Sequence, residues 1–349
     1  MNTHAVCKRG FTRIETLLVA AMVILAILLG LPGLVRQREA ARLAECAGKL
    51  KQIGVALHLY HDTHRSFPAG MISGWDAGAQ VHRGNGFSWG AGLLPHMGYT
   101  ELSNKLDFRM GVSVGTNREA IEALGGIPEV LCPADVGRPK VKNMWDFQKA
   151  PTTSYFGSVG AFDSWCQSDL QSGCGGFFVT DPGRPATMAS LTDGLSNTIA
   201  VGEGSHRVDK ECGVWLGLQR PSPTAEDTKA DGINQYLHMG IFPITNERLP
   251  TIAQYGLRFG SQHERGMNCL MGDGAVRFVS VDIDHIVSLI PAPGWDPDVG
   301  CWLTGGPYGC ASGVPPRGGV FQNKRLLANV MGIWQRLHHG SDGLGVEDE

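Results

Sequence analysis

The residues whose types suit chemistry best are a histidine and two Asp-Gly pairs in the second half of the chain. His263 is separated by nine residues from Asp273-Gly274, and Asp193-Gly194 comes earlier with Asn197 close behind it. A histidine near a carboxylate can act as a general base, and carboxylate oxygens can hold Ca²⁺. Asp-Gly pairs also set tight turns without any chemistry. We expect the turn role, with calcium at Asp193 and Asp273 or general-base chemistry at His263 as alternatives.

Nine cysteines offer a second kind of chemistry. None lies in a Cys-x-x-Cys pair, so a zinc ribbon is not expected. Removal of a leader that contains Cys7 would leave eight, and an even count suits disulfides in an exported domain. Cys166 and Cys174, and likewise Cys301 and Cys310, are close enough in sequence to close small loops. We predict these two disulfides, with buried free thiols as the alternative.

A charged residue at the start of a long apolar run is the third feature. The run extends from Thr16 to Val35 and follows Lys8 and Arg9. It is too long for a cleaved secretory signal, and twenty helical residues rise about 30 Å, enough to cross a bilayer core. The sequence therefore predicts a transmembrane segment. A plain anchor leaves Glu15 unexplained, because a carboxylate is costly near hydrocarbon.

The residues around Glu15 resemble a known processing signal. Lys8-Arg9-Gly10, then Phe11-Thr12-x-Ile14-Glu15 and the apolar run, are similar to the amino terminus of type IV prepilins and type II secretion pseudopilins. The resemblance implies that prepilin peptidase cuts between Gly10 and Phe11 and that Phe11 is then N-methylated. It also implies that Glu15 pairs with the Phe11 amine of a neighbouring subunit. Arg13 departs from the family, which usually has an apolar residue there.

Three later stretches carry a second resemblance. Leu131-Cys132-Pro133-x-Asp135, the segment from Asp193 to Glu203, and the segment from Phe259 to Phe278 resemble a bacterial family of prepilin-like proteins. Its members share a domain of unknown function with a carboxy-terminal His-x9-Asp-Gly motif. The resemblance covers nearly the whole chain. Residues 291–320 look like an insertion into the family pattern.

The elements that must position these residues follow from periodicity. Apolar spacings of three and four continue beyond Val35 and predict one helix from Phe11 to about Arg65. We divide the chain into a leader at 1–10, a transmembrane half-helix at 11–35, a soluble half-helix at 36–66 and a globular α+β domain at 67–349. Further helices are predicted at 88–106, 117–124, 284–289 and 326–337. Strands are predicted at 129–131, 154–159, 176–179, 198–202, 214–216, 268–271 and 276–280, the last two joined by a hairpin turn. The predicted fold is a pilin-like lollipop with an antiparallel sheet.

Composition narrows the classes of function. A net charge of -3 gives no indication of a nucleic-acid partner. The 48 glycines have no strict period, which favours a loop-rich globular domain over a collagen-like chain.

From these features we predict a non-enzymatic, pilin-like structural subunit. It would sit in the bacterial inner membrane as a single-pass protein, with a cytoplasmic amino terminus and an extracytoplasmic globular domain. Its helix would assemble into a fibre or a type II secretion-like pseudopilus. The expected partners are prepilin peptidase, further copies or other pilin-like subunits, and the inner membrane, with no cofactor beyond the calcium alternative. A membrane-tethered, extracytoplasmic ligand-binding protein that uses the same export route is the second hypothesis, and an enzyme based on His263 is the third.

Overall fold

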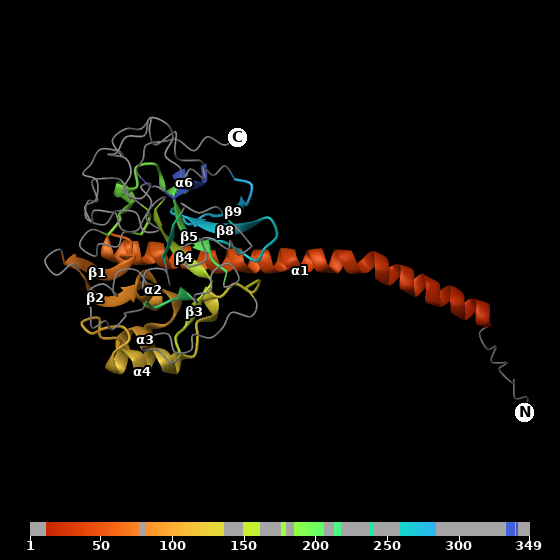
Figure 1. Ribbon diagram of the computed structural model, residues 1–349, viewed down its shortest axis with the longest axis horizontal. Helices are drawn as coiled ribbons and strands as arrows, with labels where there is room; N and C mark the ends of the chain where they lie inside the picture. The colour runs from red at the N-terminus through yellow and green to blue at the C-terminus, as the bar shows by residue number, and fades with distance from the viewer. Residues whose placement is uncertain are drawn as a thin grey trace, which may run out of the picture.

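The protein is built on one long helix that passes through a mixed helix and sheet domain (Figure 1). The computed structural model describes residues 12–76, 81–135, 149–160, 176–178, 185–205, 213–217, 237–239, 244, 259–283, 333–338 and 340. The predicted leader at 1–10, the helix at 284–289, the insertion at 291–320 and all four cysteines of the predicted disulfides lie outside these residues.

The long helix, α1, runs from Arg13 to His64. Thr12 caps its amino end through a reciprocal pair of hydrogen bonds with Glu15, and Arg65 ends it in the left-handed conformation with φ of 60°. Phe67-Pro68 follows after Ser66, and the residue before a proline is disfavoured in a helix. The helix predicted from Phe11 to about Arg65 is therefore present almost to its predicted ends.

The membrane-spanning character predicted for the first half of this helix is wrong. A span requires about 20 consecutive, predominantly apolar residues. Among the residues that the structure describes, no helix is both long enough and apolar enough to meet that requirement. The predicted transmembrane segment at 11–35 and the predicted single-pass place in the inner membrane are corrected accordingly. What the structure shows is a mixed helix and sheet fold with a five-stranded sheet.

The central sheet has the strand order β7-β4-β5-β8-β9. Its strands are β4 (Tyr155–Gly160), β5 (Ile199–Glu203), β7 (Leu237–Met239), β8 (Gly266–Met271) and β9 (Val276–Ser280). Neighbours are antiparallel except for the parallel pair β4 and β7. The predictions for β4, β5, β8 and β9 are confirmed to within two residues at each end.

The second half of α1 packs on one face of this sheet. Its buried residues Cys46, Leu50, Ile53 and Leu57 recur at spacings of three and four, which places them on one side of the helix. A Cβ atom on Gly54 would lie 2.8 Å from Leu270 Cδ1 of β8. The absence of a side chain at this position therefore lets the helix approach the sheet closely.

Small elements cover the other side of α1 (Figure 1). They are the hairpin of β1 (Met71–Asp76) and β2 (Val81–Ser88), the helices α2 (Trp89–Leu93), α3 (Thr100–Lys105) and α4 (Gly115–Leu124), the 3-10 turns η1 (Leu94–Met97) and η2 (Pro128–Val130), and the short pair β3 (Thr152–Thr153) and β6 (Gly213–Val214). The predicted strand at 129–131 is wrong, because the proline starts a 3-10 turn there. The predicted helix at 88–106 is divided among α2, η1 and α3.

The opposite face of the sheet carries a second core. Phe156, Phe259, Met267 and Met271 pack there against Trp334 of α6 (Ile333–Leu337). The 3-10 turns η5 (Met188–Ser190) and η6 (Leu195–Asn197) complete the described elements. The sheet therefore lies between α1 and α6. The loop before β8 and the turn after β8 both contact α1.

Candidate functional site

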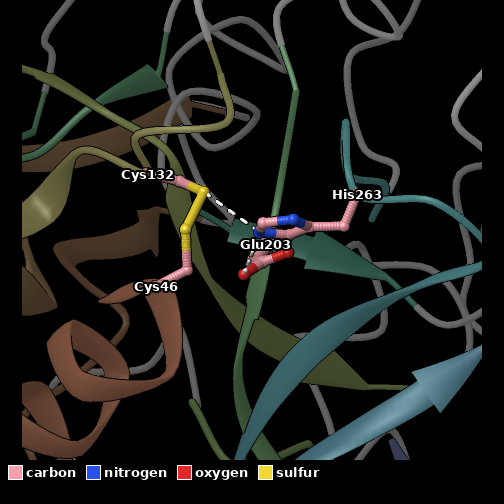
Figure 2. Close-up of side chains that lie close together, drawn as sticks. All are labelled: Cys46, Cys132, Glu203 and His263. Carbon is pink, nitrogen blue, oxygen red and sulfur yellow. Dashed lines mark hydrogen bonds and ion pairs between the residues drawn. A yellow bond between two sulfur atoms is a disulfide. The ribbon is translucent and has the colours of Figure 1, made fainter. Parts of the chain in front are cut away.

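Four buried side chains with metal-binding or redox chemistry meet where α1 crosses the sheet (Figure 2). Cys46 comes from α1, Cys132 from the loop after η2, Glu203 from the end of β5 and His263 from the loop before β8. One sulfur, nitrogen or oxygen atom from each lies within 4.8 Å of those from the other three. We call these four residues the Cys-His-Glu cluster.

The two cysteines of the cluster form a disulfide. Cys46 and Cys132 have Cα atoms 5.3 Å apart and are separated by 86 positions in the sequence. The bond fastens α1 to the loop after η2, and Lys49 supports the same contact by donating to the carbonyl of Leu131 at 2.9 Å. Cys269 is a buried free cysteine, and burial raises the pKa of its thiol. The Cys46–Cys132 pair was not among the predicted disulfides.

His263 has one ring nitrogen fixed by a carboxylate and the other facing the cluster. Its Nδ1 lies 2.6 Å from Oε1 of Glu39, on α1. An ionised carboxylate can only accept hydrogen bonds, so Nδ1 carries the proton of this bond. Nε2 then lies 3.5 Å from Sγ of Cys132 and 3.8 Å from Oε1 of Glu203. Because Glu39 and Cys46 are seven residues apart on α1, they share one face of the helix.

Glu203 is almost completely buried, with 1% of its surface exposed. Ser261 Oγ donates to its Oε2 at 2.6 Å, and Asn268 Nδ2 donates to its Oε1 at 3.1 Å. Burial raises the pKa of the Glu203 carboxyl group, while the neighbouring His263 and these hydrogen bonds act in the opposite direction. Asn268 Nδ2 also lies within hydrogen-bond distance of the carbonyl of Leu43 in α1, at 3.2 Å. The carboxyl group is therefore held in one orientation, with one oxygen towards the cluster.

The pKa of Glu203 predicts a pH-dependent cost to stability. A carboxyl group with a raised pKa binds its proton more tightly in the folded than in the unfolded chain, so the folded state loses relative stability as the pH rises above about 4.5. Glu203→Gln should remove this loss and keep the side-chain shape. As the pH rises, the variant should therefore gain stability relative to the wild type. Urea denaturation of both proteins at several pH values measures this difference in unfolding free energy. Glu101→Gln, on the surface of α3, is the control, and an equal pH trend in both variants would contradict the prediction.

A second polar network holds the loops that carry the cluster. Asp135 accepts from Ser154 Oγ at 3.0 Å and from Gln262 Nε2 at 2.8 Å. Gln262 Nε2 also donates to Ser205 Oγ at 3.1 Å. These hydrogen bonds join Asp135, Ser205 and Gln262. Asp135 follows Cys132 by three residues, Ser205 follows Glu203 by two, and Gln262 directly precedes His263. Three stretches that sequence analysis treated as separate motifs form one site.

The predicted Asp-Gly residues lie elsewhere. Asp273 and Gly274 form the turn between β8 and β9, where Asp273 Oδ1 accepts from the Ala275 amide at 2.8 Å and Gly274 has φ of +82°. Lys51 of α1 donates to the Gly274 carbonyl at 2.6 Å. His263 precedes β8 and Asp273 follows it, so the length of that strand, about 20 Å, separates them. The two residues are not brought together.

The segment that follows the earlier Asp-Gly pair packs against this turn. The amide of Asp273 donates to the carbonyl of Leu195 at 3.2 Å, and Asn197 Nδ2 donates to the carbonyl of Asp193 at 3.1 Å. Within the described part of the chain, neither Asp193 nor Asp273 belongs to a group of three side chains that could hold a metal ion. The observed contacts of Asp193, Asn197, Asp273 and Gly274 are those of turn residues that dock on one another and on α1.

The amino-terminal half of α1 is the other unusual surface. Among the side chains that the structure describes between Ile14 and Leu31, eleven large apolar ones are 49% to 71% exposed. They are Ile14, Leu17, Leu18, Val19, Met22, Val23, Ile24, Leu25, Ile27, Leu28 and Leu31. At the start of this segment Glu15 accepts from the Thr12 amide at 2.8 Å, and this hydrogen bond lowers the pKa of the Glu15 carboxyl group. Gly10 and Phe11 lie outside the described residues.

Fold and site together define a class of protein in which an α+β domain is fastened to one long helix by a buried Cys-His-Glu cluster. We call this domain, formed by the described elements after α1, the head. Residues 36–285 match the family described as "Protein of unknown function (DUF1559)", and the chain belongs to this family. The matched region begins after the exposed apolar half of α1 and includes all four residues of the cluster. No curated protein and no solved structure matches the chain.

Proposed function

We propose that the protein is a pilin-like structural subunit that assembles with further copies of itself through the amino-terminal half of α1. The observation that carries the proposal is the exposed apolar surface from Ile14 to Leu31, which extends away from the head (Figure 1). A contiguous apolar surface of this kind on a folded chain marks an interaction site.

The distribution of these side chains indicates several neighbours rather than one. Successive residues of a helix are about 100° apart. The consecutive residues Met22, Val23, Ile24 and Leu25 therefore point in four directions, and each is at least half exposed. A helix that is apolar on all sides is stable only when surrounded. A bundle or fibre of parallel copies surrounds each helix, whereas a two-helix contact would leave one side in water.

Prepilin-type maturation is part of the same proposal. Prepilin peptidase would cut between Gly10 and Phe11, so that the mature chain begins one residue before the helix cap at Thr12. The new amine would lie four residues from Glu15, whose carboxylate is at the solvent-exposed first turn. In a bundle, that carboxylate can neutralise the amine of an adjacent copy. Mass spectrometry of the mature protein should find N-methylated Phe11 as its first residue, and an intact Met1 would contradict this step.

The assembly is tested by polar substitutions on the exposed half of α1. Leu17→Gln, Met22→Gln and Val23→Gln, combined, place glutamine on three sides of the helix and keep a residue with good helix propensity. Each lost apolar contact removes about 1.5 kcal/mol or more, so self-association should weaken roughly a thousandfold or more. Sedimentation velocity and electron microscopy should show assemblies for the wild type and single copies for the variant.

The same helix provides the matched control. Val55 and Leu59 are 52% and 44% exposed on the part of α1 that crosses the head. Val55→Gln with Leu59→Gln makes the same kind of substitution at two exposed apolar positions outside the proposed interface, and this variant should assemble like the wild type. Equal assembly of all three proteins would rule out the amino-terminal half of α1 as the interface.

A further inference from the structure

We propose that the Cys-His-Glu cluster binds a Zn²⁺-like divalent cation when its two cysteines are reduced, with Cys46, Cys132, His263 and Glu203 as the four ligands. The disulfide and the metal are then alternative states of one site (Figure 2). The site is independent of the proposed assembly, because its residues belong to the head and to the half of α1 that crosses it.

The donor atoms are those of a tetrahedral zinc site. Two thiolates, one imidazole nitrogen and one carboxylate oxygen are all common ligands of Zn²⁺. Zinc holds sulfur at about 2.3 Å and nitrogen or oxygen at about 2.0 to 2.2 Å, which places neighbouring ligand atoms about 3.3 to 3.8 Å apart. His263 Nε2 lies 3.5 Å from Cys132 Sγ and 3.8 Å from Glu203 Oε1. These two distances are close to the required spacing, all four ligand atoms lie within 4.8 Å of one another, and the two sulfurs must separate for the cation to enter.

Outer hydrogen bonds orient both non-sulfur ligands. Glu39 accepts from Nδ1 of His263 at 2.6 Å, which leaves the lone pair of Nε2 directed at the cluster. Ser261 and Asn268 hold the carboxyl group of Glu203. A carboxylate behind a ligating histidine and hydrogen bonds behind a ligating carboxylate are the usual supports of metal ligands.

A disulfide alone does not account for this surrounding structure. A buried sulfur–sulfur bond is neutral and needs neither an oriented imidazole nor a buried carboxyl group beside it. Burial of the Glu203 carboxyl group carries a desolvation cost. A bound cation would offset that cost by supplying the opposite charge. The arrangement is explained when the site holds a cation in its reduced state.

The change from the oxidised to the metal-bound state requires an external dithiol as reductant. An external dithiol supplies two electrons and two protons to the disulfide, which opens to two thiols while the dithiol becomes a disulfide. Zn²⁺ then displaces one proton from each thiol as the two thiolates bind it. Because Cys46 lies on α1 and the other three ligands lie on the head, the metal would restore the link that reduction removes.

The test compares reduced and oxidised forms of the full-length protein. The chain is reduced with a phosphine, freed of reductant under anaerobic conditions and titrated with Zn²⁺ against a chromogenic chelator. We expect the reduced protein to bind one equivalent at this site with a Kd below about 1 μM, and the oxidised protein to lack this binding. With Co²⁺ in place of Zn²⁺, the reduced protein should show sulfur-to-cobalt charge-transfer bands and the intense visible bands of a tetrahedral site.

Variants assign the ligands. Cys46→Ala with Cys132→Ala should abolish the cobalt–sulfur bands, and His263→Ala should weaken zinc binding by at least about 100-fold, since even loss of an outer-shell partner costs about 10- to 100-fold. Glu39→Gln changes only such an outer-shell partner and should weaken zinc binding by about 10- to 100-fold. Cys269→Ala, which removes a buried free thiol outside the cluster, is the control and should bind like the wild type.

Three results would overturn the proposal. The first is that the reduced wild type binds no zinc. This result counts against the proposal both if the reduced protein is folded and if it is unfolded and does not refold when zinc is added. The second is an unchanged cobalt spectrum in the double cysteine variant, which would place the binding at other cysteines. The third is unchanged affinity in His263→Ala after its fold has been verified by circular dichroism in the oxidised form.

Discussion

Loss of the Cys46–Cys132 disulfide should lower the free energy of unfolding by about 4 to 5 kcal/mol, one of the two largest effects we expect from a small change in this chain. A cross-link stabilises mainly by restricting the unfolded chain, and the entropy of a loop of this length corresponds to that range. Cys46→Ala with Cys132→Ala removes the link, together with the contact between Cys132 Sγ and His263 Nε2. The measurement is urea denaturation of the oxidised wild type and the variant.

Cys269→Ala separates the cross-link from the loss of a buried sulfur. Cys269 lies in β8, is fully buried and forms no disulfide. Its replacement should cost only about 1 kcal/mol, as for an average buried substitution. Equal destabilisation by the two variants would show that the link contributes no more than ordinary packing. Proteolysis should also distinguish them, because only loss of the disulfide frees α1 from the loop after η2.

Local sequence patterns were sufficient to predict the framework of the fold. The three- and four-residue spacing of apolar residues in α1 predicts a helix, and Phe67-Pro68 predicts where that helix ends. The β8–β9 hairpin follows from two short strand segments on either side of the turn signal Gly272-Asp273-Gly274. Each of these signals lies within a few residues of the element that it predicts.

The strands and turns that sequence analysis missed depend on distant contacts. Residues 81–88 are polar, yet they form β2 because β1 pairs with them and Ser88 then caps α2. Residues 129–131 are apolar enough for a strand, but the proline at their edge sets a 3-10 turn. The apolar run from Thr16 to Val35 predicted a transmembrane segment from its length and hydrophobicity, but the described helix does not meet the requirement for a span.

The candidate site could not be assembled from sequence because its residues are far apart along the chain. Cys46 and Cys132 are 86 positions apart, and Glu39 and His263 are 224 apart. Spacing favoured the short cysteine loops instead, since nothing in the sequence indicates which of many pairings occurs. The sequence did indicate three of the four cluster residues, because Cys132, Glu203 and His263 each lie in one of the three stretches that carry the family resemblance. It did not indicate that these three stretches meet at α1.

Glu15 has one role that the structure shows and a second that the proposed assembly gives it. In the single chain its side chain accepts from the Thr12 amide, while Thr12 Oγ1 accepts from the Glu15 amide at 3.3 Å. This capping box explains a glutamate at this position without any neighbour. The proposed assembly instead gives the carboxylate a charge to neutralise, the Phe11 amine of an adjacent copy. Only the second role requires the negative charge.

Glu15→Gln should therefore abolish assembly while leaving the helix start intact. Glutamine also serves in a capping box, so the first turn of α1 should keep its helical structure. The amine of each neighbour would lose its counter-charge inside the bundle, where an unpaired charge is strongly unfavourable. Thr12→Ala is the complementary control, because it removes one capping bond, at a cost of about 1 kcal/mol, but keeps the carboxylate. Sedimentation of the mature chains should show single copies for Glu15→Gln and assemblies for Thr12→Ala. The reverse pattern would assign Glu15 to capping alone, and the apolar surface from Ile14 to Leu31 would then have to associate without a charge pair at its end.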